Sequence, residues 1–116
     1  MFKVIRIDHV SLNTGDRPAT IDFYEHVVGL PVGRRHDQLD APVFLGPDRA
    51  QFGLFGDRSP GLRHIAIATD EPSQRALVER LEARGIAYRP EHHSTSFSIY
   101  FDDPDGATIE ILVPTA

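Results

Sequence analysis

The sequence predicts an α+β fold that is built from two copies of one β-α-β-β-β module. Two strand-like segments, 6–13 and 61–68, each carry a histidine at the same place. The segments that close the two halves, 50–55 and 107–112, also match each other. The chain of 116 residues can enclose one compact core, whereas neither half would bury its own sheet well alone. We therefore expect the two modules to pair in one mixed sheet.

In the first module, apolar and β-branched residues predict a strand at 4–12 that a polar turn ends. Asp16 or Thr14 can cap the helix that follows, with Pro18 in its first turn. Gly29 is expected to end this helix. The remaining strands of the module are expected at 31–36, 42–46 and 50–55.

The second module repeats this plan with a strand at 62–68 and a helix at 72–84, which Gly85 ends. Three more strands are expected at 86–89, 96–101 and 107–113. Asp102-Asp103-Pro104-Asp105-Gly106 is a strong turn signal between the last two. These elements define a single domain over 1–116, with its modules at about 1–56 and about 61–116.

Strand alternation sorts the side chains of four strands into an apolar face and a face of small, polar or ionisable residues. The polar faces carry His9, Ser11, His64, Ser98, Tyr100 and Glu110. Pairing of the modules would bring His9, His64 and Glu110 together, and such a cluster is costly to bury without a cation. Two imidazoles and one carboxylate leave positions open on a divalent metal ion. The sequence therefore predicts a metal site.

Simpler roles for these residues stay open. A single strand histidine is more often a hydrogen-bonded structural residue than a metal ligand. The Tyr100 hydroxyl can donate to a metal-bound substrate, or its ring can merely pack in the wall of the site. His92 and His93 precede a predicted strand, where they can reach the site or remain solvated.

Composition excludes several classes of function. The net charge of −5 and the lack of a dense Lys/Arg run argue against nucleic acid as the main partner. No segment approaches the roughly 18 consecutive apolar residues that span a membrane. The chain contains no cysteine, so it has no disulfide framework, and we expect a cytoplasmic location.

Three motifs resemble those of the vicinal oxygen chelate superfamily, which includes glyoxalase I, extradiol dioxygenases, fosfomycin-modifying transferases and bleomycin-binding proteins. The motifs are Ile7-Asp8-His9-Val10, Leu62-Arg63-His64-Ile65-Ala66, and the segment 98–106 that runs into Ile109-Glu110. The resemblance covers essentially the whole chain. It implies two β-α-β-β-β modules that curl around a metal, with His9, His64 and Glu110 at the ligand positions.

Departures from this pattern narrow the choice of activity. The fourth, carboxylate ligand of glyoxalase I falls on Gly53, which cannot bind metal, and neighbouring Gln51 is a poor substitute. The catalytic His-His pair of dioxygenases falls on Arg49-Ala50, although Tyr100 matches the dioxygenase tyrosine in its spacing to the glutamate. Fosfomycin enzymes place basic residues around the phosphonate, including one beyond the metal glutamate. No Lys or Arg follows Arg89 here, which argues against phosphonate binding.

The sequence thus predicts a metal-dependent enzyme that acts on a small oxygenated metabolite, with dioxygenase-like ring cleavage by Fe(II) as the first specific hypothesis. Mn, Zn, Ni and Co suit the same ligands. The alternatives are a glyoxalase-like isomerase or lyase, a fosfomycin-type thiol transferase, and a metal-free drug- or metabolite-binding resistance protein. Tyr100 is the expected catalytic donor. The expected substrate-lining residues are Ser11, Gln51, Ser98, His92 and His93. We also expect a homodimer, because two modules leave sheet edges and apolar faces to bury.

Overall fold

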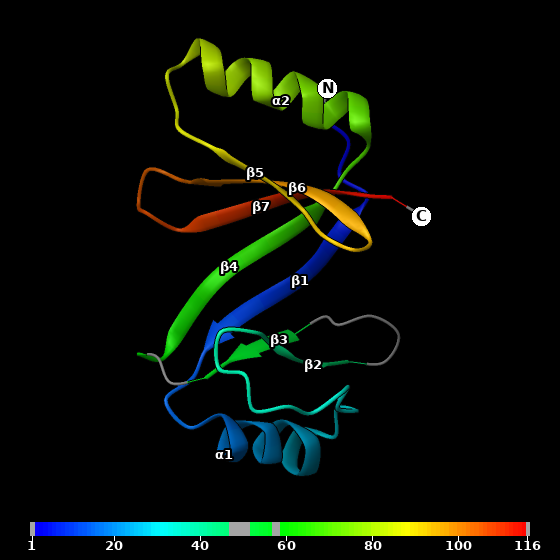
Figure 1. Ribbon diagram of the computed structural model, residues 1–116, viewed down its shortest axis with the longest axis vertical. Coiled ribbons are helices and arrows are strands. Elements are labelled where there is room, and N and C mark those ends of the chain that lie inside the picture. Colours follow the sequence, from blue (N-terminus) through cyan, green and yellow to red (C-terminus); the bar gives the residue numbers. More distant parts are fainter. Residues whose placement is uncertain (1, 47–51, 57–58, 116) are drawn as a thin grey trace. The chain divides into compact units, whose positions relative to one another are not determined.

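The computed structural model describes residues 2–46, 52–56 and 59–115 (Figure 1). The α+β prediction is confirmed: this part of the chain contains seven strands and two helical segments. The chain divides into two compact units, of which the first combines Met1–Asp8 with His64–Ala116 and the second is His9–Arg63. The boundary therefore crosses β1 (Arg6–Asn13) and β4 (Gly61–Ala68).

The second unit contains α1 (Arg17–Asp22), its π-helical continuation η1 (Phe23–Val28), β2 (Val43–Leu45) and β3 (Phe52–Phe55). The strand order is β2-β3-β1, with β3 parallel to β1 and antiparallel to β2. Asp16 caps α1 by accepting a 3.1 Å hydrogen bond from the Ala19 amide, and Gly29 ends the helix with φ 92°. Under the helix lies a buried core of Ile21, Val43, Leu45 and Leu54.

The prediction of a strand at 31–36 is wrong. Only an isolated bridge between Val32 and Leu45 forms, because the following residues, Arg34 to Asp37, offer no apolar face to bury. The segment is instead held by Arg17, whose side chain is buried at 4% exposure. Its guanidinium donates four hydrogen bonds, of 2.7–3.2 Å, to the carbonyl oxygens of His36, Gln38, Ala41 and Leu54.

Replacing Arg17 with methionine should destabilise this unit. Methionine fills a similar volume but supplies no donor, so buried carbonyl oxygens lose their partners at a cost of about 1–3 kcal/mol each before the segment relaxes. We expect the free energy of unfolding to fall by about 2 kcal/mol in urea denaturation. Arg34→Met, in the same segment but exposed, is the control. Equal stability of both variants would contradict a structural role for Arg17.

The first unit contains β4, α2 (Glu71–Ala83), β5 (Arg89–His92), β6 (Ser96–Asp102) and β7 (Thr108–Pro114). The strand order is β4-β7-β6-β5, in which β4 and β7 are parallel and the other pairs antiparallel. β5 starts later than the expected 86–89, because the Ile86 amide still donates to the Leu81 carbonyl at the end of α2. The turn at 102–106 joins β6 to β7 as expected.

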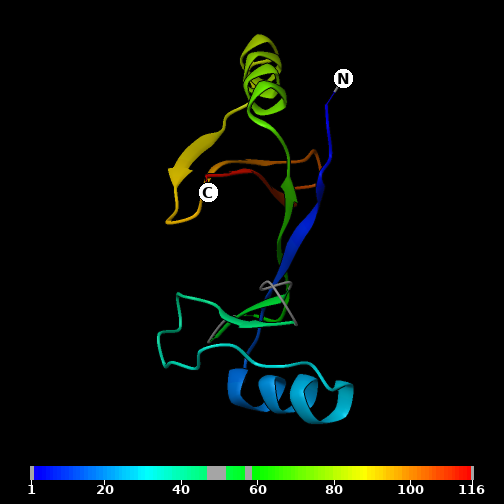
Figure 2. The same cartoon turned by 90° about the vertical axis from the view of Figure 1, so that its right-hand side faces the viewer.

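Helix α2 covers one face of the β7-β6-β5 sheet, as both views show (Figures 1 and 2). Its buried Gln74 donates to the carbonyl oxygens of Phe97 and Ile111 and so fixes the helix on the strands. The opposite face carries the side chains that alternate with Phe97 and Ile99 on β6. Ala66, Ala68 and Leu112 form a buried apolar cluster on that face. The same face carries Ser98 beside Leu112, and Tyr100 beside Glu110.

The N-terminal segment of the first unit runs antiparallel to the end of β4. The Ile5 amide donates to the Ala68 carbonyl at 2.9 Å, and the Thr69 hydroxyl donates to the Lys3 carbonyl. No helix within 2–46, 52–56 and 59–115 is long and apolar enough to cross a membrane.

Candidate metal centre and substrate site

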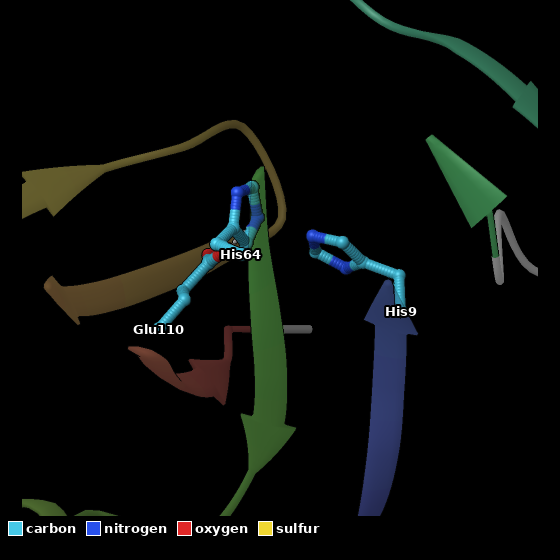
Figure 3. A group of neighbouring side chains, drawn as sticks. All are labelled: His9, His64 and Glu110. Carbon is cyan, nitrogen blue, oxygen red and sulfur yellow. Dashed lines mark ion pairs between the residues drawn. The ribbon is translucent and has the colours of Figure 1, made fainter. Parts of the chain in front are cut away.

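The centre of the candidate site in the first unit is a contact between His64 on β4 and Glu110 on β7. His64 Nε2 lies 3.1 Å from Glu110 Oε1, and the two residues are only 9% and 2% exposed. Figure 3 draws this pair together with His9. The parallel pairing of β4 with β7 sets His64 beside Thr108 and Ala66 beside Glu110, so both ionisable side chains lie on the face that α2 leaves uncovered.

The second carboxylate oxygen of Glu110 is held by β6. The Ser98 hydroxyl donates to Glu110 Oε2 at 2.6 Å, and Ser98 is fully buried. A charge-assisted hydrogen bond of this kind favours the ionised carboxylate and fixes its orientation. The neighbouring strand therefore presents Glu110 Oε1 to His64.

Tyr100 stands directly opposite Glu110 across the β6–β7 pair. Burial raises the pKa of the Tyr100 hydroxyl, and the negative charge of Glu110 and a hydrogen bond to it raise that pKa further. Tyr100 is therefore a neutral phenol and a hydrogen-bond donor at neutral pH. Its oxygen also lies 2.9 Å from His93 Nε2, which is 3.7 Å from Glu110 Oε2.

The adjacent residues His92 and His93 have different contacts. His93 reaches the Tyr100–Glu110 pair, whereas the His92 ring packs on Phe97, with ring centroids 4.6 Å apart, and Phe97 faces α2. The Arg89 guanidinium, from the neighbouring strand β5, lies 4.6 Å from the Tyr100 ring centroid. The structure brings together five expected site residues, His64, His93, Ser98, Tyr100 and Glu110, and sets His92 apart. Gln51 lies outside the described residues.

In the second unit, His9 and Ser11 share the face of β1 that points away from the helix-covered core. The parallel register sets Ser11 beside Gly53, and the antiparallel register sets Gly53 beside Phe44. Val43 and Leu45 turn into the core, so Phe44 lies on the same face as His9. The two rings meet edge to face, with centroids 6.1 Å apart.

The chemistry of these groups fits a divalent metal ion. A buried carboxylate in contact with an imidazole costs desolvation energy, which a bound cation would offset. Imidazole nitrogen and carboxylate oxygen are ligands for iron, manganese, zinc, nickel and cobalt. Ser98 supplies the hydrogen bond from a neighbouring residue that typically orients a carboxylate ligand.

Sequence reasoning did not identify Phe44 and Arg17 as important residues. For Phe44 a signal was present, since alternation between Val43 and Leu45 turns it to the opposite face. No comparable signal marks Arg17, whose four acceptors come from two separate parts of the chain, 36–41 and Leu54.

Comparison with known proteins places the chain in a family. Residues 6–111 match the model of the Glyoxalase/Bleomycin resistance protein/Dioxygenase superfamily. A virulence protein of Salmonella typhimurium is 31% identical over 118 residues, which cover 91% of this chain and 82% of that protein. A lactoylglutathione lyase of Arabidopsis thaliana is 30% identical over 125 residues, which cover 92% of this chain.

Among solved structures, the 2,3-dioxygenase LapB of Pseudomonas sp. KL28 has the same fold, with a TM-score of 0.82 at 22% identity over the whole of this chain. The chain spans 43% of that dioxygenase chain and 44% of the Arabidopsis lyase. The match over nearly all of its length shows that this chain belongs to the glyoxalase, bleomycin resistance protein and dioxygenase superfamily.

Proposed function

We propose that the chain binds one divalent metal ion through His9, His64 and Glu110 and acts on a small molecule that presents two adjacent oxygen atoms. Each of these residues can offer one ligand atom. The observation that carries the proposal is the buried 3.1 Å contact between His64 and Glu110, which a cation would stabilise.

His9 is the candidate third ligand, and it comes from the second unit. On β1 it alternates with Val10 and so shares the face of Ser11, which lies outside the core under the helix. In the repeated module, His9 holds the position that is equivalent to that of His64.

When bound, the metal would supply a Lewis acid for two adjacent substrate oxygens. Tyr100 would then donate its hydroxyl proton in a hydrogen bond to the substrate anion, as its raised pKa allows. His93, by donating from Nε2 to the Tyr100 oxygen, would direct that proton towards the substrate. Ser98 would hold Glu110 in place, and Ser11 would line the site.

For the reaction, we propose dioxygenase-like ring cleavage with Fe(II), and Mn, Zn, Ni or Co as other metals that the ligands suit. A glyoxalase-like isomerase or lyase is the second candidate, but Gly53 offers no proton-transferring group on the face of His9. The test is anaerobic reconstitution with metal followed by turnover assays. Turnover of catechols would indicate the dioxygenase reaction, turnover of 2-oxoaldehyde–thiol adducts the glyoxalase-like reaction, and turnover of fosfomycin the thiol-transferase alternative.

Metal content separates an enzyme of this kind from a metal-free binding protein. We expect about one equivalent of divalent metal per chain after reconstitution, measured by elemental analysis. A protein that takes up no metal would contradict the proposed mechanism and would favour a drug- or metabolite-binding role within the same family.

We further propose that 1–116 forms a single domain, that the protein is cytoplasmic, and that it is a homodimer. Apolar side chains of the N-terminal segment support the dimer, since Val4, Ile5 and Ile7 are 46–57% exposed and would gain from burial against a second copy. Light scattering at micromolar concentration should therefore give twice the chain mass of 12.9 kDa. A mass near 12.9 kDa would refute the dimer.

A further inference from the structure

Phe44 is an aromatic side chain on a sheet face that otherwise carries polar or small residues. Its strand neighbours Val43 and Leu45 are each 1% exposed in the core under the helix, whereas Phe44 is half-buried on the opposite face. That face also carries His9, Ser11 and Gly53. A ring that takes no part in the core and remains accessible is available to a ligand.

Gly53 leaves room for the Phe44 ring to pack closely against β3. A Cβ atom at this position would come within 3.2 Å of Phe44 Cε1, within 3.2 Å of Ser11 Oγ and within 3.4 Å of Pro42 Cβ. A side chain here would therefore require the Phe44 ring and the Ser11 hydroxyl to shift by a few tenths of an ångström. The absence of a Cβ lets the ring lie close against β3 and beside His9, at a centroid distance of 6.1 Å.

We propose that Phe44 is a specificity-determining residue that forms an aromatic wall beside the metal ligand His9 and selects planar aromatic molecules with two adjacent oxygens. This inference rests on the proposed metal site, because His9 is what links Phe44 to the reacting oxygens. A flat ring bound next to His9 can pack on Phe44, and aromatic pairs gain stability beyond the area that they bury. A small aliphatic chelator has no ring to make this contact.

The test measures the binding of two chelators to Co(II)-loaded protein, followed by visible absorbance without turnover. The aromatic probe is 4-nitrocatechol, and the aliphatic probe is acetohydroxamate. We expect Phe44→Ala to weaken 4-nitrocatechol binding about tenfold and to leave acetohydroxamate binding within about twofold. Phe44→Leu, which keeps apolar bulk but removes the aromatic face, should show the same selective loss and covers the case in which the alanine variant does not fold.

Phe52→Leu is the matched control, because Phe52 lies on the neighbouring strand but packs on the helix side against Tyr24. It should leave the affinity for both probes unchanged. Unchanged 4-nitrocatechol affinity in both Phe44 variants, or an equal loss for both probes, would overturn the role of Phe44 and leave the metal site standing. Failure of the unsubstituted protein to bind Co(II) at all would overturn the metal site and this inference with it.

Discussion

Glu110→Gln should weaken metal binding by about 100-fold or more while leaving the protein folded. Glutamine keeps the shape of the side chain and can still accept the Ser98 hydrogen bond, but it removes the negative charge that a divalent ion needs. Loss of residues that merely orient a ligand costs about 10–100-fold in metal affinity, so loss of a ligand itself should cost at least the upper value. Competition with a chromophoric chelator measures the change.

The stability of the metal-free protein is the second measurement for this variant. Glu110 is 2% exposed, so its carboxylate is poorly hydrated, and removal of a buried charge offsets part of the weakened attraction to His64. We expect the free energy of unfolding to change by no more than about 1 kcal/mol. Glu91→Gln, on the exposed edge strand β5, is the control and should bind metal normally. Undiminished metal affinity in Glu110→Gln would remove Glu110 from the ligand set.

Tyr100→Phe should lower turnover by on the order of 10²-fold while costing about 1 kcal/mol of stability. The substitution removes only the hydroxyl, and the ring keeps its packing against His64, whose centroid lies 6.0 Å away. The raised pKa of Tyr100 means that the group removed is a proton donor rather than a phenolate. If this donor acts mainly on the transition state, kcat should fall more than the substrate affinity.

Tyr88→Phe is a matched control for this substitution. Tyr88 also donates its hydroxyl to a carboxylate, at 2.8 Å to Glu82 Oε2, but that contact is exposed and involves α2. Turnover in this variant should therefore stay within about twofold. A Tyr100→Phe variant that turns over its substrate at the full rate would show that Tyr100 only packs in the wall of the site.

Local patterns in the sequence determined much of the fold. Alternation on β6 separated Ser98 and Tyr100 from Phe97 and Ile99, and the structure places these pairs on opposite faces. Asp16 caps its helix and Gly85 ends the other with φ 66°, as their residue types predicted. These features depend on a few neighbouring residues, so the sequence carries them directly.

The tertiary structure decided what depends on contacts between distant segments. The sequence predicted a strand at 31–36, but the carbonyl oxygens of His36 and Gln38 accept hydrogen bonds from Arg17 instead. No local pattern encodes this contact, because Arg17 is distant in the sequence. Likewise, adjacent His92 and His93 differ in role only because the pairing of β5 with β6 sends one ring to Phe97 and the other to Tyr100. The residue types determine which side-chain groups the chain can bring to a site. Strand register determines which of these groups come into contact, and it depends on two segments of the chain together.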